Sequence, residues 1–283
     1  HSADETRASL ANNLRYFIKW SLIALLIGGT GGLIGSLFSM GVSFATSFRM
    51  NHPNMLFFLP VSGILIVWLY HTFHEEGNRG TNMVIDAISS TEKVTLATGP
   101  LIFVSTVLTH IAGGSSGREG AALQLGGSLG NLFGNAIHLD EKDKKIAIMC
   151  GMSAVFSALF GTPVAAAIFP LEVISIGVLY YAALVPCIFS SFIGVGIARY
   201  LGIAGEHFTV LSIPAISVSS VGWIIFLSAL CAGVSIVFCL MLHGAEHTYR
   251  KIFPNPYVRI LAASAIFILL TLLIEIGRAS CRE

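Results

Sequence analysis

Long apolar tracts alternate with short polar connections along the chain. A membrane-spanning helix needs about 20 mostly apolar residues. Tracts near or above that length cover residues 17–48, 55–73, 146–160, 163–201, 221–242 and 260–274. Charged residues gather between them, at residues 1–15, 74–82, 138–145 and 243–256. The pattern predicts an all-α polytopic membrane protein.

Composition supports contact with a lipid bilayer. Hydrophobic residues make up 54% of the chain and charged residues only 11%, whereas soluble domains carry roughly 25% charged residues. The net charge is +1 without a basic cluster, so no surface for nucleic acid is expected. We expect an integral protein of a prokaryotic plasma membrane. Lysines and arginines are shared among several loops, which leaves the orientation open.

Several apolar pieces are too short, or too interrupted by Gly and Pro, to cross a bilayer. They include residues 100–112, residues 121–137 and the piece that starts at residues 161–163. Broken helices are tolerated in a membrane only where protein or a water-filled cavity surrounds them. These pieces therefore point to a permeation site.

The sequence GGSSGREGAALQLGG, residues 113–127, reads as a loop that opens a helix. Gly113, Gly114, Gly117 and Gly120 permit close backbone approach and unusual dihedral angles. The first turn of a helix has unpaired N–H groups and the positive end of the macrodipole. Such an end, when buried, is an anion site.

Glu119 lies in this first turn and is the candidate for gating and proton transfer. Its carboxylate can occupy the anion site when no ion does, and it can leave on protonation or displacement. An ionisable group inside a membrane protein costs about 3 kcal/mol or more at a helix centre and marks a functional candidate. The alternative is a structural ion pair with Arg118 or Arg79.

Three segments in this order resemble the CLC family of chloride channels and anion/proton antiporters. They are GREG at residues 117–120, LQLGGSLG at 123–130 and SALFGTPVAAAIFPLE at 157–172. The family patterns are GREGP or GKEGP, QIGG, and FNAPLAG followed by a glutamate, and the resemblance extends over most of the chain from Trp20. It implies an inverted-repeat fold with short and broken helices, and a homodimer with one anion pathway per subunit. It also implies that Glu119 is the gating glutamate, and that the anion-binding residues here are Gly117, Arg118, Gly120 and Ala121, the last in place of the family's Pro.

A second anion-binding motif of the family, GSGIP, matches NRGTNM at residues 78–83. The resemblance implies anion-binding residues at Arg79, Gly80, Thr81, Asn82 and Met83. Arg79 stands where the family has a serine, unless a shift of two residues puts Thr81 there. Backbone amides from Gly80 to Met83 and the side chains of Arg79, Thr81 or Asn82 can donate hydrogen bonds.

A further departure concerns protons and the identity of the anion. Chloride antiporters of the family carry an internal glutamate next to the one that aligns with Glu172, and Val173 stands there in this chain. Glu172 is then a structural or vestibule residue. We expect transport of a halide, chloride first, by a channel or an anion/proton antiporter. The alternative is a fluoride/proton antiporter of the same family.

The expected organisation has four parts: a polar segment at 1–16, a first membrane repeat at 17–216, the start of a second repeat at 217–275, and a non-native tail at 276–283. The helices that begin near Trp20 and Trp223 resemble each other loosely, as in transporters built from inverted repeats. The tail IGRASCRE drops the apolar pattern and resembles translated adapter sequence. We expect the C-terminal half of the fold, with its anion ligands, to be missing.

Other motifs have simpler explanations. HTFHEE at residues 71–76 lacks the HExxH spacing of a metal site and reads as a solvated loop. GGTGGLIG at 28–35 predicts close helix packing through small residues, and His110 is expected to be a hydrogen-bonded structural imidazole. Cys150, Cys187, Cys231 and Cys239 are expected to be reduced residues of helix packing. An intramembrane hydrolase that uses Ser115 or Ser116 with His110 would need a GxSxG pattern or a similar constellation, so we expect no enzyme and no cofactor.

Overall fold

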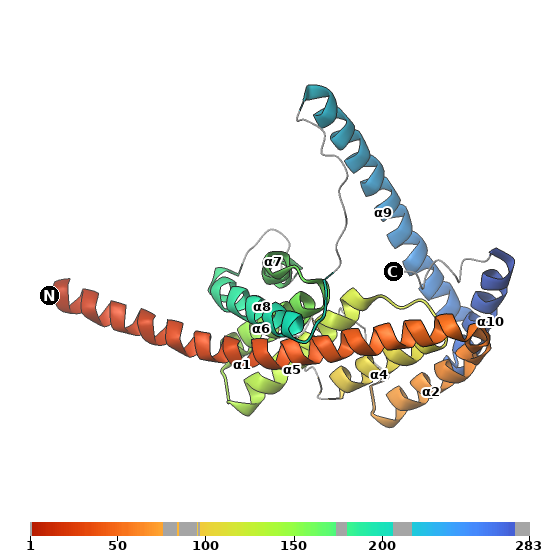
Figure 1. Ribbon diagram of the computed structural model, residues 1–283, viewed down its shortest axis with the longest axis horizontal. Coiled ribbons are helices and arrows are strands. Elements are labelled where there is room, and N and C mark those ends of the chain that lie inside the picture. Colours follow the sequence, from red (N-terminus) through yellow and green to blue (C-terminus); the bar gives the residue numbers. More distant parts are fainter. Residues whose placement is uncertain are drawn as a thin grey trace.

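A computed structural model describes residues 2–75, 84, 95, 97–173, 180–205 and 217–274, and the elements in this part are helical. In chain order they are α1 (Ser2–Asn51), the 3-10 helix η1 (Pro53–Phe58), α2 (Leu59–Thr72), α4 (Thr98–Ile111), α5 (Arg118–Ala136), α6 (Glu141–Phe160), α7 (Pro163–Val173), α8 (Tyr181–Tyr200), α9 (Val218–Ile252) and α10 (Pro256–Ile274). Figure 1 shows α1 running along the whole helical body, which α5, α6 and α8 form with it. The polar residues before residue 17 continue α1 and do not form a separate element.

Glycines on α1 let two other helices approach it closely. A Cβ atom at Gly28 or Gly32 would lie within 3.0 Å of backbone atoms of Ser190 or Gly194 in α8. On the next side of α1, a Cβ atom at Gly31 would lie 2.7 Å from the Cβ atom of Ala154 in α6. The prediction that GGTGGLIG serves close helix packing is confirmed.

The tightest crossing joins α5 to α6, and it again depends on glycine. A Cβ atom at Gly126 would lie 2.3 Å from the Gly151 carbonyl oxygen, and one at Gly130 would lie 2.2 Å from the Ala147 carbonyl oxygen. Side chains are excluded at this crossing because the two backbones touch. The crossing fixes α5, the helix that starts with the GREG motif, against the centre of the bundle.

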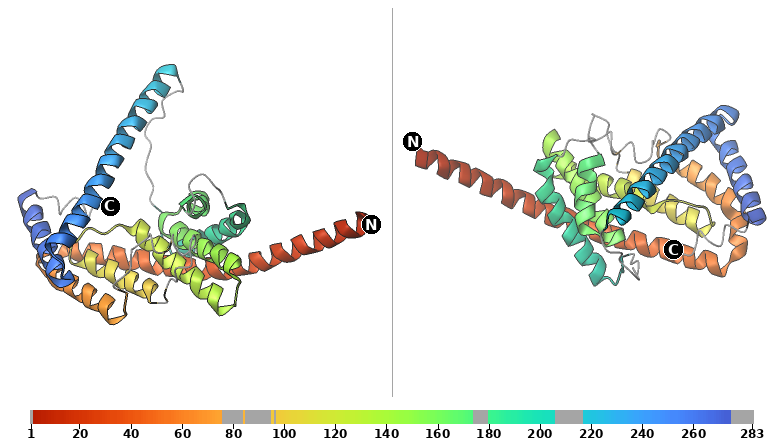
Figure 2. Two further views of the ribbon diagram at one scale, coloured as in Figure 1. Left: turned by 180° about the vertical axis from the view of Figure 1, so that it is seen from behind. Right: turned by 90° about the horizontal axis from the view of Figure 1, so that it is seen from above.

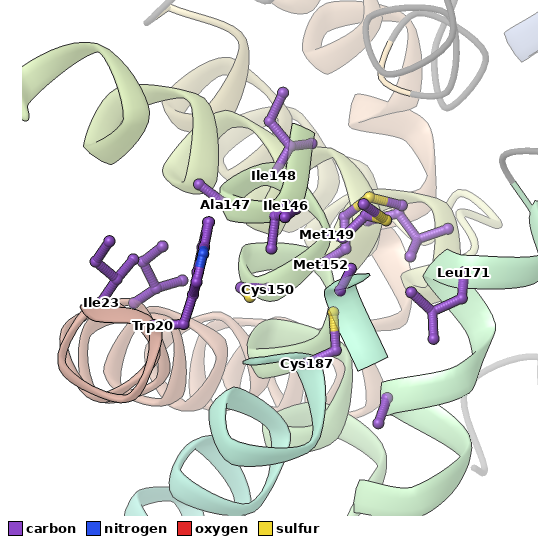
Figure 3. Close-up of a cluster of buried hydrophobic side chains, with 14 of the residues drawn as sticks. Trp20, Ile23, Ile146, Ala147, Ile148, Met149, Cys150, Met152, Leu171 and Cys187 are labelled. Carbon is purple, nitrogen blue, oxygen red and sulfur yellow. The ribbon is translucent and has the colours of Figure 1, made fainter. Parts of the chain in front are cut away.

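The main hydrophobic cluster lies between α1, α6, α7 and α8 (Figure 3). Trp20 and Ile23 of α1 face Ile146 and Cys150 of α6, while Cys187 joins the cluster from α8. Cys150 and Cys187 are buried free thiols, as predicted for residues of helix packing.

Cys231 and Cys239 are also free thiols, as predicted, but they are exposed on α9 and not buried between helices. None of the described residues of α9 is buried, because this helix projects away from the body, as Figure 1 and the left view of Figure 2 show. By contrast, α10 packs on α2, where Ile260 lies against Gly63.

Within the described residues, five helical stretches are long and apolar enough to cross a membrane. They are Asn12–Asn51, Pro53–Thr72, Tyr181–Tyr200, Val218–Ile252 and Pro256–Leu273, and the shorter apolar helices are Thr98–Ile111 and Pro163–Val173. The expectation of a polytopic chain with short helices among long ones is confirmed. The apolar tract at 163–201 contains the two helices α7 and α8.

Several helices end in a residue with a positive φ, which turns the chain sharply. Gly113, at φ 76°, ends α4, and Gly161, at φ 71°, ends α6. His74 and His138 hold the same left-handed conformation after α2 and α5, at φ 57° and 51°. These turns set the direction in which the chain leaves each helix, including the two segments that matter for the site.

Candidate anion site

The GREG motif forms the start of α5, as the sequence predicts. Gly117 is the N-cap, with extended backbone angles and no side-chain hydrogen bond to the helix. The first N–H groups of a helix have no acceptor within it, and here no capping side chain supplies one. The first turn therefore offers N–H donors and the positive end of the helix dipole to an anion.

The loop before α5 is held at its start by a turn at Gly113. The Gly113 amide donates to the His110 carbonyl at 3.0 Å and the Gly114 amide donates to the Thr109 carbonyl at 2.9 Å. This pair of bonds around a left-handed residue is the Schellman arrangement of a helix C-terminus. It ends α4 and sends residues 114–117 toward the start of α5.

The side chain of Glu119 folds back over the N-terminus of α5. Its Oε2 atom lies 3.2 Å from the position that a Cβ atom at Gly117 would occupy, and the residue is exposed. A carboxylate at this end of a helix is favoured by the macrodipole. The position is the one expected of a carboxylate that stands in for an anion at the helix tip.

The alternative of a structural ion pair finds no support among the described residues. Ion pairs in this part of the chain join Lys19 to Asp143, Lys144 to Glu141 and Arg250 to Glu246. Glu119 is in none of them. Its carboxylate is thus not held by a described basic side chain.

Ala121 fits the anion site less well than the other three residues predicted in this motif. With Gly117 as the N-cap, the Gly117 carbonyl accepts the first intrahelical bond, which comes from the Ala121 amide. The Ala121 side chain is buried in a cluster with Phe38 of α1 and Leu159 of α6. Anion binding by Gly117, Arg118, Gly120 and Ala121 stays a prediction, and Ala121 is the one of the four whose side chain lies in the core.

The start of α5 lies near the end of α6. Ala121 and Ala122 share their cluster with Leu159, and Phe160 packs against it. The chain then turns at Gly161, and α7 begins at Pro163. The two gapped segments that the sequence singled out, at 117–120 and 160–163, therefore adjoin the same cluster.

The second predicted anion motif falls outside the described residues. This applies to Arg79, Gly80, Thr81, Asn82 and Met83. Val84, directly after them, is helical and buried, and it packs on α5 where a Cβ atom at Gly127 would lie 2.3 Å from its Cγ1. The residue that follows the motif thus contacts the helix that carries Glu119.

Three other candidates have clear positions. Glu172 is exposed on α7, next to Val173. The His110 imidazole forms a 2.8 Å bond through Nδ1 with the Thr106 carbonyl of its own helix, which confirms the structural reading. The described residues contain no group of three or more His, Cys, Asp or Glu suited to a metal.

Sequence reasoning missed two buried charged residues, Arg49 and Glu75. Arg49, in the last turn of α1, is 9% exposed, and its Nε atom has no hydrogen-bond partner. It packs against Gly113, where the loop to α5 begins. Glu75, 6% exposed, lies just after α2. No motif marks either residue, since their burial arises from contacts between distant segments.

The helix arrangement and the GREG geometry agree with the sequence comparison. The model of the family described as voltage gated chloride channel matches residues 62–280. The chain belongs to the voltage-gated chloride channel family. It is an integral multi-pass membrane protein of this family, and its fold is the all-helical CLC type.

Relatives within the family come from a bacterium and an archaeon. A protein of Pseudomonas syringae pv. tomato named chloride/fluoride channel protein is 34% identical over 209 residues, which cover 74% of this chain and 46% of that protein. An uncharacterized protein of Methanocaldococcus jannaschii is 27% identical over 240 residues, 83% of this chain and 56% of its own length. The chain spans about half the length of these curated relatives.

Solved structures of the family share the fold. A CLC-type fluoride/proton antiporter matches with a TM-score of 0.87 and 31% identity, over 93% of this chain and 67% of that chain. A slow cyanobacterial Cl−/H+ antiporter matches with a TM-score of 0.69 and 20% identity, over 88% of this chain and 63% of that chain. At 20% identity the second match is evidence for the fold alone.

Proposed function

We propose that this chain is part of a transporter that exchanges a halide for protons across the membrane, with Glu119 as gate and proton carrier. One observation carries the proposal: an acidic side chain folds back over the uncapped N-terminus of α5. The anion and the carboxylate compete for the same N–H donors of Gly117, Arg118 and Gly120. A neutral, protonated Glu119 gives up the site, so a proton enters the cycle as the anion does.

Fluoride is the anion that we propose first, ahead of the chloride that the sequence suggested. The Pseudomonas syringae relative is named for both anions, and the solved structure at 31% identity is a fluoride/proton antiporter. The chloride/proton antiporter is only 20% identical. Arg79 in place of the motif serine, and Val173 in place of an internal glutamate, are further departures from the chloride pattern.

Residues 79–83 remain part of the proposed pathway. Val84, the residue that follows this segment in the chain, lies against α5 at Gly127. We propose that the amides of Gly80 to Met83, with the side chains of Arg79, Thr81 or Asn82, bind the anion together with α5.

Ion flux from liposomes tests this function. The aligned 209 residues of the chain replace their counterpart in the Pseudomonas syringae protein, so that the chimera is a complete transporter. Fluoride and chloride efflux are recorded with ion-selective electrodes, and proton movement is recorded with a pH electrode. We expect fluoride efflux that drives proton uptake in a fixed ratio, and much slower chloride efflux.

The unmodified Pseudomonas syringae protein serves as the positive control, and gel filtration shows whether the chimera is folded. A folded chimera that moves neither anion would contradict the proposal. Chloride efflux as fast as fluoride efflux would contradict the preference for fluoride and make chloride the first candidate anion again. Anion efflux without proton movement would indicate a channel.

We further propose that residues 17–216 form the first repeat, that residues 217–275 begin the second, and that the working unit is a homodimer. The exposed apolar stripe of α8, with Val185, Ile188 and Phe192, is a surface that a second copy would cover. Light scattering of the chimera in detergent tests the dimer. A monomer mass would contradict it.

A further inference from the structure

Glu75 is a buried carboxyl group that the proposed function does not yet use. It is 6% exposed, and it is the one buried acid among the residues whose side chains the structure describes. An ionisable residue buried in a membrane protein marks an ion pathway or a proton relay by default. Its neighbours indicate which of these roles it has.

A turn at the end of α2 directs Glu75 inward. His74 takes the left-handed conformation at φ 57°, the His74 amide donates to the His71 carbonyl at 3.1 Å, and the Glu75 amide donates to the Tyr70 carbonyl at 2.9 Å. A residue other than glycine rarely holds this conformation, and outliers of this kind gather at functional sites. His71, Thr72, Phe73 and His74 are exposed, so the buried carboxyl lies next to chain that reaches the surface.

Hydroxyl groups link Glu75 to the start of α4 and to α5. The Thr95 hydroxyl donates to Glu75 Oε1, and it lies 3.1 Å from the buried Thr98 hydroxyl. The Ser128 hydroxyl on α5 donates to the Thr95 carbonyl at 3.2 Å. A short chain of polar groups therefore runs from the end of α2 to the middle of α5.

The polar chain continues along α5 toward Glu119. Gly120, Gln124 and Ser128 recur every four residues, which places them on one face of the helix. Gln124 is 6% exposed, and its Oε1 atom has no hydrogen-bond partner. Burying an amide oxygen without a hydrogen-bond partner costs free energy. The Gln124 Oε1 atom can therefore accept a hydrogen bond from a proton donor on this face of α5.

The titratable and polar groups near Glu75 come from α2 and its end, from α4 and from α5. Tyr70 on α2 interacts with it electrostatically, and His74 and Glu76 are the adjacent titratable residues in sequence. Thr98 on α4 and Ser128 on α5, which are linked to Glu75 through Thr95, are neutral. No lysine or arginine within the described ranges forms an ion pair with it.

We propose that Glu75 is a second proton-binding residue of the transport cycle, and this inference rests on the proposed function. The carboxylate takes one proton from water at the exposed end of α2 and becomes a neutral acid. It then passes that proton to the Thr95 hydroxyl, which gives up its own proton to the Thr98 hydroxyl 3.1 Å away. Water carries the proton from there along α5 toward Glu119. Glu75 thereby takes the role of the internal glutamate of the chloride antiporters, whose place in this chain is held by Val173.

Glu75→Gln in the chimera tests this role, because glutamine still accepts the Thr95 hydrogen bond but cannot carry a proton. We expect fluoride efflux within about twofold of the unsubstituted chimera and a ratio of protons to fluoride at least fivefold lower. The pH dependence of the efflux rate should flatten as well. Glu141→Gln, which changes an exposed acid at the start of α6, is the matched control and should leave the ratio unchanged.

The outcomes separate this inference from the proposed function. If Glu75→Gln keeps the normal ratio while Glu119→Gln loses proton movement, Glu75 is not a proton carrier and the proposed function stands. If Glu75→Gln lowers fluoride and proton movement in equal proportion, the residue is structural and the inference fails. If Glu119→Gln retains proton coupling, the proposed function itself fails.

Discussion

Two acidic side chains at helix ends have different surroundings. Glu119 lies at the N-terminus of α5, where the helix dipole favours a negative charge and the side chain is exposed. Glu75 lies beyond the C-terminus of α2, where burial and hydroxyl groups surround it. The first environment suits a carboxylate that competes with an anion, and the second suits a group that exchanges a proton.

The turns that end α2 and α5 predict a gain in stability from glycine. His74 and His138 hold left-handed angles that cost an L-residue about 1–2 kcal/mol, partly offset by the entropy that glycine loses on folding. We expect His74→Gly and His138→Gly each to raise the stability by about 0.5–1 kcal/mol, measured by thermal unfolding in detergent. His243→Gly, within exposed α9, should instead lower it by up to about 0.5 kcal/mol. A loss of stability at both turn positions would argue against the turn geometry.

Sequence alone could find Glu119 but not Glu75. The glycines around GREG, followed by helix-forming residues, mark a helix start in one short segment. Glu75 lies in HTFHEE, which reads as a solvated loop because burial there depends on a histidine in a left-handed conformation and on Thr95, 20 residues away. Neither feature leaves a local pattern.

At the scale of helices, glycine decides which pairs touch. The GGTGGLIG stripe of α1 could be interpreted from sequence, because small residues at helical spacing predict close packing. The contact of Gly126 with Gly151 could not be predicted, since the two glycines lie in different helices and no local pattern pairs them. The bounds of α7 and α8 within residues 163–201 could not be predicted, because uniformly apolar sequence carries little periodicity.

The crossing of α5 and α6 should not tolerate a single added methyl group. Gly126→Ala would put a Cβ atom 2.3 Å from the Gly151 carbonyl oxygen, and we expect a loss of about 1–3 kcal/mol or more. Gly196→Ala in α8 is the matched control, because nothing lies within 4 Å of its Cβ position. It should leave stability unchanged or raise it by up to about 1 kcal/mol. Equal effects of the two changes in a thermal unfolding assay would refute the tight crossing.

At the scale of the molecule, the structure consists of a packed helical bundle and a long helix, α9, that projects from it. Helices α1, α5, α6 and α8 bury the main clusters, whereas α9 buries none of its described residues (Figure 2). Such an apolar helix is stable only where lipid or further protein covers it. We infer that α9 spans the bilayer.

Labelling of the α9 cysteines tests this inference. Cys231 and Cys239 lie within the membrane-length stretch of α9 and are exposed in the isolated chain. In liposomes they should react at least tenfold more slowly with a membrane-impermeant maleimide than a cysteine introduced by Glu246→Cys near the end of α9. Reaction at comparable rates would show that the middle of α9 faces water.

The central claim is that one carboxylate at the tip of α5 both mimics the halide and carries the proton. Its most direct test is the Glu119→Gln change in the chimera, with fluoride efflux and proton uptake recorded together in liposomes. The account predicts fluoride efflux that continues, or rises, with no accompanying proton movement. Proton uptake that stays coupled to fluoride in this variant would contradict it.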